Sequence, residues 1–361
     1  MSTNFFFKTL SVDNYRGLKN LKIEKLRRIN LIGGLNGTGK STLLDIIFLI
    51  LDRRNPAALL RPFTSRGMPM PFPNGFNYVF GVGGMQKNVE IKSTTLKGDV
   101  EFSLSLGQVP NPMTISAANN PLQPALSSPA TFDSNQLGMH LKVKLNGKED
   151  EAGCIAQVSQ EALNYNLYKI GTAPLVGGAY LSSTIRASPL EDAQRFSNLM
   201  KEKRGAEITE ALQFVNPDLS SFQLLQDGNM PTLYATMKDG TMLQTSMLGG
   251  GFQSVLSIAL IMMSTKDGII LFDEIDSTIH YSKLNFFWAL VSRLADKNNC
   301  QVFAVTHSRE CIVSALNGAI EENLISDIQY IRLENDDNES DSIIYTGEEL
   351  KEALASGWEI R

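Results

Sequence analysis

The chain has 361 residues, of which 43% are hydrophobic and 20% are charged, and its formal net charge at pH 7 is −5. This composition indicates an ordinary globular protein whose core fills one large or two modest domains. The negative net charge argues against a protein that coats nucleic acid through its overall charge. Because residues 1–62 are basic and residues 321–361 are acidic, a local patch could still bind phosphate.

Neither the cysteines nor the apolar runs indicate an extracellular or membrane-bound protein. The three cysteines, Cys154, Cys300 and Cys311, are odd in number and lack a CxxC spacing, which fits a reducing compartment. The apolar run Phe5–Phe7 is too short for a signal-peptide core, and Leu43–Leu51 is far below the roughly 20 residues that span a bilayer. We therefore expect a cytoplasmic protein without a membrane partner.

The first part of the chain predicts two short strands and then a strand, a glycine-rich loop and a helix. Residues 34–41 (GLNGTGKS) lie between two apolar runs and carry the full GxxxxGK[ST] pattern. Glycines let successive backbone N–H groups converge on a phosphate, and the following helix adds its positive N-terminus. The pattern in this context therefore predicts a nucleoside triphosphate site.

The side chains of this phosphate loop have separate expected roles. Lys40 would reach the β- and γ-phosphates, and the hydroxyl of Ser41 would ligate Mg²⁺. The residues expected to hold the nucleotide are Asn36, Gly37, Thr38, Gly39, Lys40, Ser41 and Thr42.

The middle of the chain predicts a mixture of strands, loops and helices. Alternating apolar residues predict strands at 89–102 and 141–145. Between them, residues 103–140 are rich in proline and nearly uncharged, which predicts a long loop or insertion. Residues 189–210 are expected to be helical, and residues 222–237 to form a hairpin with an Asp-Gly-Asn turn.

The last part of the chain alternates helices with buried strands. An apolar helix begins at Gly249–Gly251, and a helix at 282–295 lies between buried strands at 269–272 and 302–305. This alternation predicts a largely parallel sheet. We expect an α/β fold in which a mixed sheet is flanked by helices and carries an inserted β and loop region and a helical region. The expected parts are residues 1–94, 95–180, 181–245 and 246–361, with the first and last forming one nucleotide-binding unit.

Polar residues follow the two buried strands of the last part. Asp273 and Glu274 end the first strand, and His307 follows the second within a Thr-His-Ser sequence. In a parallel sheet the ligand lies beyond the carboxyl ends of the strands. We therefore expect Asp273 to hold Mg²⁺, Glu274 to polarise the attacking water and His307 to contact the γ-phosphate.

Gly249, Gly250 and Gly251 predict a second helix N-terminus that binds phosphate. One protomer already has a phosphate loop. We therefore expect this second cradle to complete the nucleotide site of a facing protomer.

Five segments together resemble the ABC-type ATPases of the RecF-like and OLD (overcoming lysogenization defect) group. They are an opening motif, a Walker A, a signature, a Walker B and a switch-histidine strand, at residues 14–18 (NYRGL), 34–41, 248–252 (LGGGF), 273–274 and 301–308. The resemblance implies that two subunits sandwich two ATP molecules with Mg²⁺, and that Arg16 contacts the base or a phosphate. A guanine-reading Asn-Lys-x-Asp sequence does not occur, which favours ATP over GTP.

The sequence also departs from this group. The signature has Gly249 where the group has serine, which puts sensing of the γ-phosphate across the dimer in doubt while leaving backbone donors available. Asp276 and Ser277 are candidates to cross the dimer interface, and Gln86 is the candidate for the glutamine that helps to bind the metal. The Toprim nuclease half of many OLD-type proteins does not follow, so we expect a stand-alone ATPase.

Several functions fit an ATPase of this kind. The first is an ATP-hydrolysing homodimer or higher oligomer that gates a separately encoded effector, such as a nuclease in prokaryotic anti-phage defence. The second is an ATP-dependent scaffold or sensor with little turnover. The third is a RecF-like repair ATPase that binds DNA through basic residues that include Arg27 and Arg28. A P-loop kinase is the weakest alternative, because a kinase needs neither a switch histidine nor a signature helix.

Overall fold

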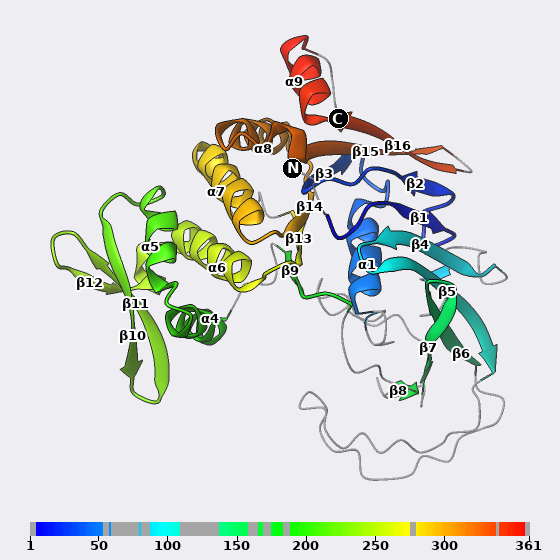
Figure 1. Cartoon of the computed structure of the whole chain (residues 1–361), viewed down its shortest axis with the longest axis horizontal. Coiled ribbons are helices and arrows are strands. Elements are labelled where there is room, and N and C mark those ends of the chain that lie inside the picture. Colours follow the sequence, from blue (N-terminus) through cyan, green and yellow to red (C-terminus); the bar gives the residue numbers. More distant parts are fainter. Residues whose placement is uncertain are drawn as a thin grey trace.

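The computed structural model contains one central sheet, one larger antiparallel sheet and a small hairpin lobe (Figure 1). It describes residues 5–52, 58, 79–80, 87–108, 137–157, 165–168, 175–182, 188–274, 279–336 and 339–357. Within these ranges, no helix has both the length and the apolar character needed to cross a bilayer.

The central sheet has six strands in the order β16-β15-β3-β14-β13-β9. All neighbouring pairs are parallel except β15 and β16. The alternation of buried strands and helices thus forms the largely parallel sheet that it predicts. The strands are β3 (Ile29–Gly34), β9 (Gly178–Ser182), β13 (Ile269–Asp273), β14 (Gln301–Val305), β15 (Ile328–Asp336) and β16 (Glu339–Thr346).

The central sheet separates two hydrophobic cores. Along β13, Ile270 and Phe272 join the core with the helices of one face, whereas Ile269 and Leu271 join the core with α1 on the other. Every residue of β13 and β14 is buried, as expected for strands covered on both faces. The helices are α1 (Lys40–Leu51) on one face, α6 (Gly250–Ser264), α7 (Leu284–Lys297) and α8 (Arg309–Glu321) on the other, and α9 (Gly347–Ala355) near the C-terminus.

A seven-stranded antiparallel sheet packs beside α1, in the order β2-β1-β4-β5-β6-β7-β8. The expected single strand at 89–102 is two strands, because the chain turns at Leu96–Lys97 and Gly98 has a φ of 115°. The expected loop at 103–140 is wrong at its ends, which are paired strand, and residues 109–136 lie outside the described residues. The strands are β1 (Leu10–Asp13), β2 (Leu21–Ile23), β4 (Val89–Thr95), β5 (Gly98–Gln108), β6 (Leu137–Leu145), β7 (Lys148–Gln157) and β8 (Tyr165–Tyr168).

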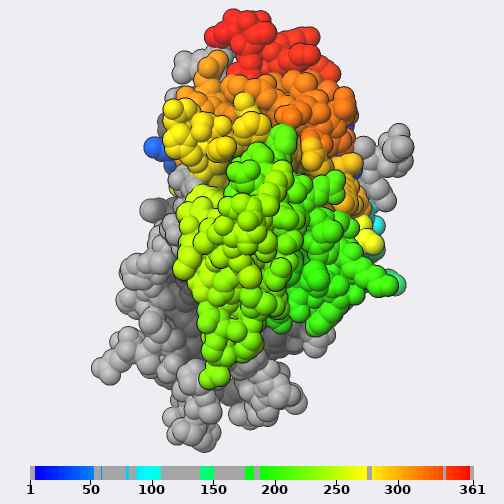
Figure 2. All heavy atoms as spheres, turned by 90° about the vertical axis from the view of Figure 1, so that its left-hand side faces the viewer, coloured from blue at the N-terminus to red at the C-terminus, as the bar shows by residue number. Residues whose placement is uncertain are grey.

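A lobe of two helices and three strands projects from the core on the side of α6 (Figures 1 and 2). Its hairpin turns at Gly228, between Asp227 and Met230, which confirms the predicted hairpin. The helix predicted at 189–210 is instead two helices, because the chain breaks at Lys203, whose φ is 61°. The elements are α4 (Pro189–Lys201), α5 (Gly205–Gln213), β10 (Leu219–Asp227), β11 (Met230–Met237) and β12 (Met242–Gln244), with 3₁₀ turns at Thr245–Leu248, Tyr281–Lys283 and Ile325–Asp327 elsewhere.

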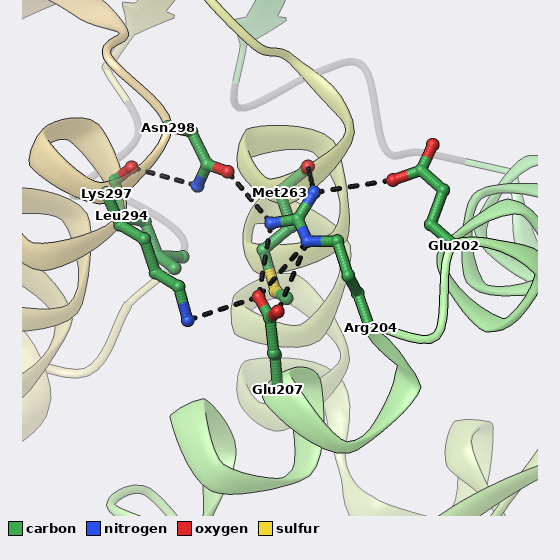
Figure 3. Close-up of polar contacts among 7 residues, drawn as sticks. All are labelled: Glu202, Arg204, Glu207, Met263, Leu294, Lys297 and Asn298. Carbon is green, nitrogen blue, oxygen red and sulfur yellow. Dashed lines mark hydrogen bonds and ion pairs between the residues drawn. The ribbon is translucent and has the colours of Figure 1, made fainter.

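Arg204, in the break between α4 and α5, fastens the lobe to two helices of the core (Figure 3). Its guanidinium donates to the carbonyl oxygen of Met263 near the end of α6 (3.1 Å) and to Oδ1 of Asn298 at the end of α7 (2.9 Å). Glu207 accepts from the same guanidinium and from Lys297 of α7 (3.1 Å). The planar guanidinium of Arg204 therefore links the start of α5 to the ends of α6 and α7.

Candidate nucleotide-binding site

The phosphate loop connects β3 to α1 and requires its glycines. Gly34, Gly37 and Gly39 have φ values of 129°, 84° and 93°, in the region that favours glycine. A Cβ on Gly39 would lie 2.6 Å from Leu18, and one on Gly34 would lie 2.3 Å from the carbonyl oxygen of Leu333. Gly39 also begins α1 without a side-chain cap, so the first N–H groups of the helix are not covered by its cap residue.

Lys40 lies folded over this loop. Its side chain is 5% exposed, and its Nζ donates to the carbonyl oxygens of Gly34 (2.9 Å) and Leu35 (2.6 Å). Burial lowers the pKa of the Lys40 ammonium, while the nearby Glu274 carboxylate acts in the opposite direction. The cation is therefore held within the loop that is expected to surround a triphosphate.

Ser41 and Asp273 meet across the site. The Ser41 hydroxyl donates to Oδ1 of Asp273 (2.9 Å), which is 6% exposed at the end of β13. Hydroxyl and carboxylate oxygens are the hard donors that Mg²⁺ prefers, and Mg²⁺ in phosphate sites is held by only one or two carboxylates. The donor set therefore fits this ion, although the described residues contain no cluster of three or more histidine, cysteine, aspartate or glutamate side chains that could hold a metal. Gln86 lies outside the described residues.

Tyr180 of β9 is a member of the site that the sequence did not reveal. Its hydroxyl donates to Oδ2 of Asp273 (2.8 Å), so the two carboxylate oxygens accept from two different elements. Tyr180 lies three strands from β3 in the sheet order and 93 residues from Asp273 in the chain. The tyrosine belongs to a short apolar strand without a motif, so only the pairing of β9 with β13 could have revealed it.

Glu274 and His307 come together at the ends of β13 and β14. Nε2 of His307 lies 3.3 Å from Oε1 of Glu274, and their side chains are 42% and 50% exposed. Glu274 has a φ of 54°, and its N–H donates to the carbonyl oxygen of Val305 (3.2 Å). Two chemically active groups thus lie at the edge of the sheet, next to the Ser41 and Asp273 pair and accessible to solvent.

Two open hollows adjoin the phosphate loop. One, of about 420 Å³, is lined by residues 34–38 and 332–335 at the end of β15. The other, of about 260 Å³, is lined by residues 34–36, Thr306, His307, Ile312 and Tyr330. The histidine therefore shares a hollow with the start of the phosphate loop.

The three glycines of the expected signature lie at the start of α6. Gly249, Gly250 and Gly251 are exposed at the start of α6, and Gly249 has a φ of 89°. A Cβ on any of them would meet no atom within 4 Å. The helix α6 and the phosphate-loop helix α1 cover opposite faces of the central sheet (Figure 1), so the glycines begin a helix on the face away from α1.

Arg16 lies beside the phosphate-loop helix, in a buried ion pair. Its Nη1 lies 2.7 Å from Oδ2 of Asp45 on α1, and its guanidinium lies over the ring of Tyr15 at 5.1 Å. A contact between Arg16 and a nucleotide stays a prediction.

The expected basic patch needs a correction at Arg28. This residue is 8% exposed, and its guanidinium bonds Asp327 (3.0 Å), Asp296 (3.2 Å) and the carbonyl oxygen of Ala295. Arg28 therefore takes part in internal ion pairs and is not a surface charge that could bind DNA. Asp276 and Ser277 lie outside the described residues.

Comparisons with known proteins find ATPase domains in this chain. Residues 141–312 match the family described as AAA ATPase domain, and residues 9–68 match the family described as AAA domain. A Helicobacter pylori protein named ATP/GTP phosphatase is 21% identical over 373 residues, covering 95% of this chain and 96% of that protein. An uncharacterized protein of Methanocaldococcus jannaschii is 35% identical over 85 residues, covering 24% of this chain and 75% of that protein.

Solved structures share the fold. An Smc head bound to the C-winged helix domain of ScpA has a TM-score of 0.51 and 13% identity, covering 94% of this chain and 98% of that chain. An Smc head with an extended coiled coil, bound to the C-terminal domain of ScpA derived from Pyrococcus furiosus, has a TM-score of 0.51 and 12% identity, covering 97% and 99%. At these identities the likeness concerns the fold alone.

The two domain matches identify the chain as a P-loop ATPase, an enzyme that hydrolyses ATP, and its fold is that of the ABC-type ATPase heads. Within that class it belongs to one family with the Methanocaldococcus jannaschii protein.

Proposed function

We propose that two copies of this chain close around two ATP molecules, and that hydrolysis at these sites gates a partner protein. The observation that carries the proposal is that the phosphate loop and the glycines at the start of α6 belong to helices on opposite faces of the central sheet. Ser41, Asp273, Glu274 and His307 lie at the phosphate loop, whereas Gly249, Gly250 and Gly251 are exposed. Exposed N–H groups at a helix start are suited to bind the phosphate held by a facing copy.

The chemistry follows from the types of residue at the site. Backbone N–H groups of residues 36–42 and the Lys40 ammonium would bind the phosphates. Ser41 and Asp273 would hold Mg²⁺, whose charge neutralises the β- and γ-phosphate oxygens when it is bound. Glu274 would orient the attacking water and accept its proton, and His307, 3.3 Å away, would donate to the γ-phosphate.

A partner protein is the finer part of the proposal. Its support is the resemblance to the OLD group, together with solved Smc heads that bind a domain of ScpA. We expect a separately encoded effector, such as a nuclease in anti-phage defence, within a cytoplasmic complex. Phage plating on cells that carry the chain with its neighbouring genes tests this part. Protection that survives Lys40→Ala would contradict it.

A scaffold or sensor with slow turnover is the second candidate. The glycine at position 249 and the half-exposed side chains of Glu274 and His307 favour it, because neither catalytic group is enclosed by the chain itself. Assembly that depends on ATP without measurable phosphate release would support this candidate. The DNA-repair alternative relies on basic surface residues that include Arg28, and Arg28 is buried.

Three proteins test hydrolysis directly, namely the wild type, Glu274→Gln and Lys40→Ala. We expect Glu274→Gln to lower phosphate release by about 10²-fold or more while ATP binding is retained, because general base catalysis contributes that much. Lys40→Ala should weaken binding itself. Phosphate release and calorimetric ATP titration separate the two effects. Full activity of Glu274→Gln would remove the proposed role of this carboxylate.

A further inference from the structure

We propose that Tyr180 is a positioning residue that sets the affinity of the nucleotide site for a divalent metal. Its hydroxyl donates to Oδ2 of Asp273 at 2.8 Å and leaves Oδ1 directed to Ser41 at 2.9 Å. The inference rests on the proposed binding of ATP with Mg²⁺ by Ser41 and Asp273, and it adds a residue that neither the motifs nor the comparisons assign.

The contact is buried and chemically matched. Tyr180 and Asp273 are 8% and 6% exposed. An ionised carboxylate only accepts hydrogen bonds, and the hydroxyl of a buried tyrosine requires a partner. A hydrogen bond to a charged acceptor is about twice as strong as a neutral one. Tyr180 is therefore suited to fix the rotation of the Asp273 carboxylate.

Tyr180 is packed between β13 and α1. In the parallel register of β9 and β13, Tyr180 pairs with Leu271, two residues before Asp273 and on the same face of the sheet. The ring of Tyr180 also meets Phe48 of α1 edge-on, with centroids 6.2 Å apart. One side chain thus contacts the acidic strand and the phosphate-loop helix, the two elements that supply the expected metal ligands.

The Tyr180→Phe substitution keeps the ring and removes only the hydroxyl. Oδ2 of Asp273 then loses this donor, and the carboxylate can rotate away from Ser41. We expect the affinity for ATP in the presence of Mg²⁺ to fall about tenfold, the size of one charge-assisted hydrogen bond. The affinity for ATP without metal should not change, because the hydroxyl donates to Asp273, which is expected to hold the metal, whereas the phosphate loop and Lys40 are expected to hold the phosphates.

The experiment is calorimetric titration of the full chain with ATP, once with Mg²⁺ and once with EDTA. The matched control is Tyr234→Phe, which removes a hydroxyl that also donates to a carboxylate, Asp227 at 3.2 Å, but in the lobe. We expect the ratio of the two affinities to fall only in Tyr180→Phe. Circular dichroism of both variants verifies that each is folded.

An unchanged ratio of the two affinities in Tyr180→Phe would overturn the inference. This holds whether neither affinity falls or both fall equally, because the hydroxyl then does not act on the metal. If the wild type binds ATP in neither condition, the proposed function fails and the inference fails with it. A double-mutant cycle with Ser41→Ala adds a second measurement. Because both residues act through Asp273, the effect of Tyr180→Phe should shrink in that background, and a full effect would contradict the inference.

Discussion

Glu274 has an uncommon local conformation at the site. Its φ of 54° is uncommon for a residue with a side chain, and such strain persists where the surrounding structure fixes it. Here the N–H of Glu274 is held by the carbonyl oxygen of Val305, and its carboxylate lies beside His307. The turn after β13 therefore directs the carboxylate toward the neighbouring strand end rather than along its own strand.

Asp192 leads to a prediction about pH at the residue scale. This carboxylate of α4 is 5% exposed, accepts from the hydroxyl of Ser257 on α6, and lies 3.3 Å from Arg195. Burial raises its pKa, and the Ser257 and Arg195 contacts only partly oppose that rise. The folded state therefore favours the protonated acid.

The sign of the pH effect follows from this raised pKa. The stabilising contribution is complete below the unfolded carboxyl pKa of about 3.9, and it is lost as pH rises through the raised pKa of the folded protein. As pH rises through this window, the free energy of unfolding of the wild type should fall relative to that of Asp192→Asn. Above the window, the difference between the two proteins should stay constant. Urea unfolding of both proteins at several pH values measures the difference. A difference that does not depend on pH would contradict the assignment.

At the scale of elements, Arg204 joins the lobe to the core through hydrogen bonds to Met263 and Asn298. We expect Arg204→Ala to lower the free energy of unfolding by about 2 kcal/mol, because it leaves Glu207, Asn298 and the Met263 carbonyl with fewer partners. Arg204→Lys keeps the charge but loses the planar fork, so it should restore only part of the loss. Chemical denaturation measures both. Equal stability of all three proteins would show that the Arg204 contacts do not stabilise the attachment of the lobe.

The elements also show which parts of the site the sequence can predict. The phosphate loop is contiguous, so its spacing alone predicts strand, loop, helix and ligand. The positions of the carboxylates at the end of β13 and of the histidine after β14 follow from strand order. Tyr180 could not be predicted, because its role depends on the pairing of β9 with β13. Arg28 could not be assigned either, since its burial depends on Asp327, 299 residues away. The break between α4 and α5 at residues 202–204 could not be predicted, because the helical sequence pattern continues through it. The contacts of Arg204 with α6 and α7 explain the break.

At the scale of the whole molecule, the separation of the two cradles predicts complementation between copies. Gly250 has open space around its Cβ position, so Gly250→Trp should fold but obstruct a facing copy. Lys40→Ala and Gly250→Trp should each be inactive alone. When the two variants are mixed in equal amounts, about half of the dimers should be heterodimers, and each heterodimer has one intact site out of two. We therefore expect about a quarter of wild-type phosphate release. No recovery on mixing would mean that the two cradles do not serve one site.

The association of two copies around ATP is the central claim, and the mass of Glu274→Gln in solution tests it most directly. Light scattering should give the 39.8 kDa monomer without nucleotide and twice that mass with ATP and Mg²⁺. The double variant with Gly250→Trp should stay monomeric in both conditions. A mass that does not respond to ATP, whether monomeric or already assembled, would contradict the claim and place the contact between copies away from the nucleotide.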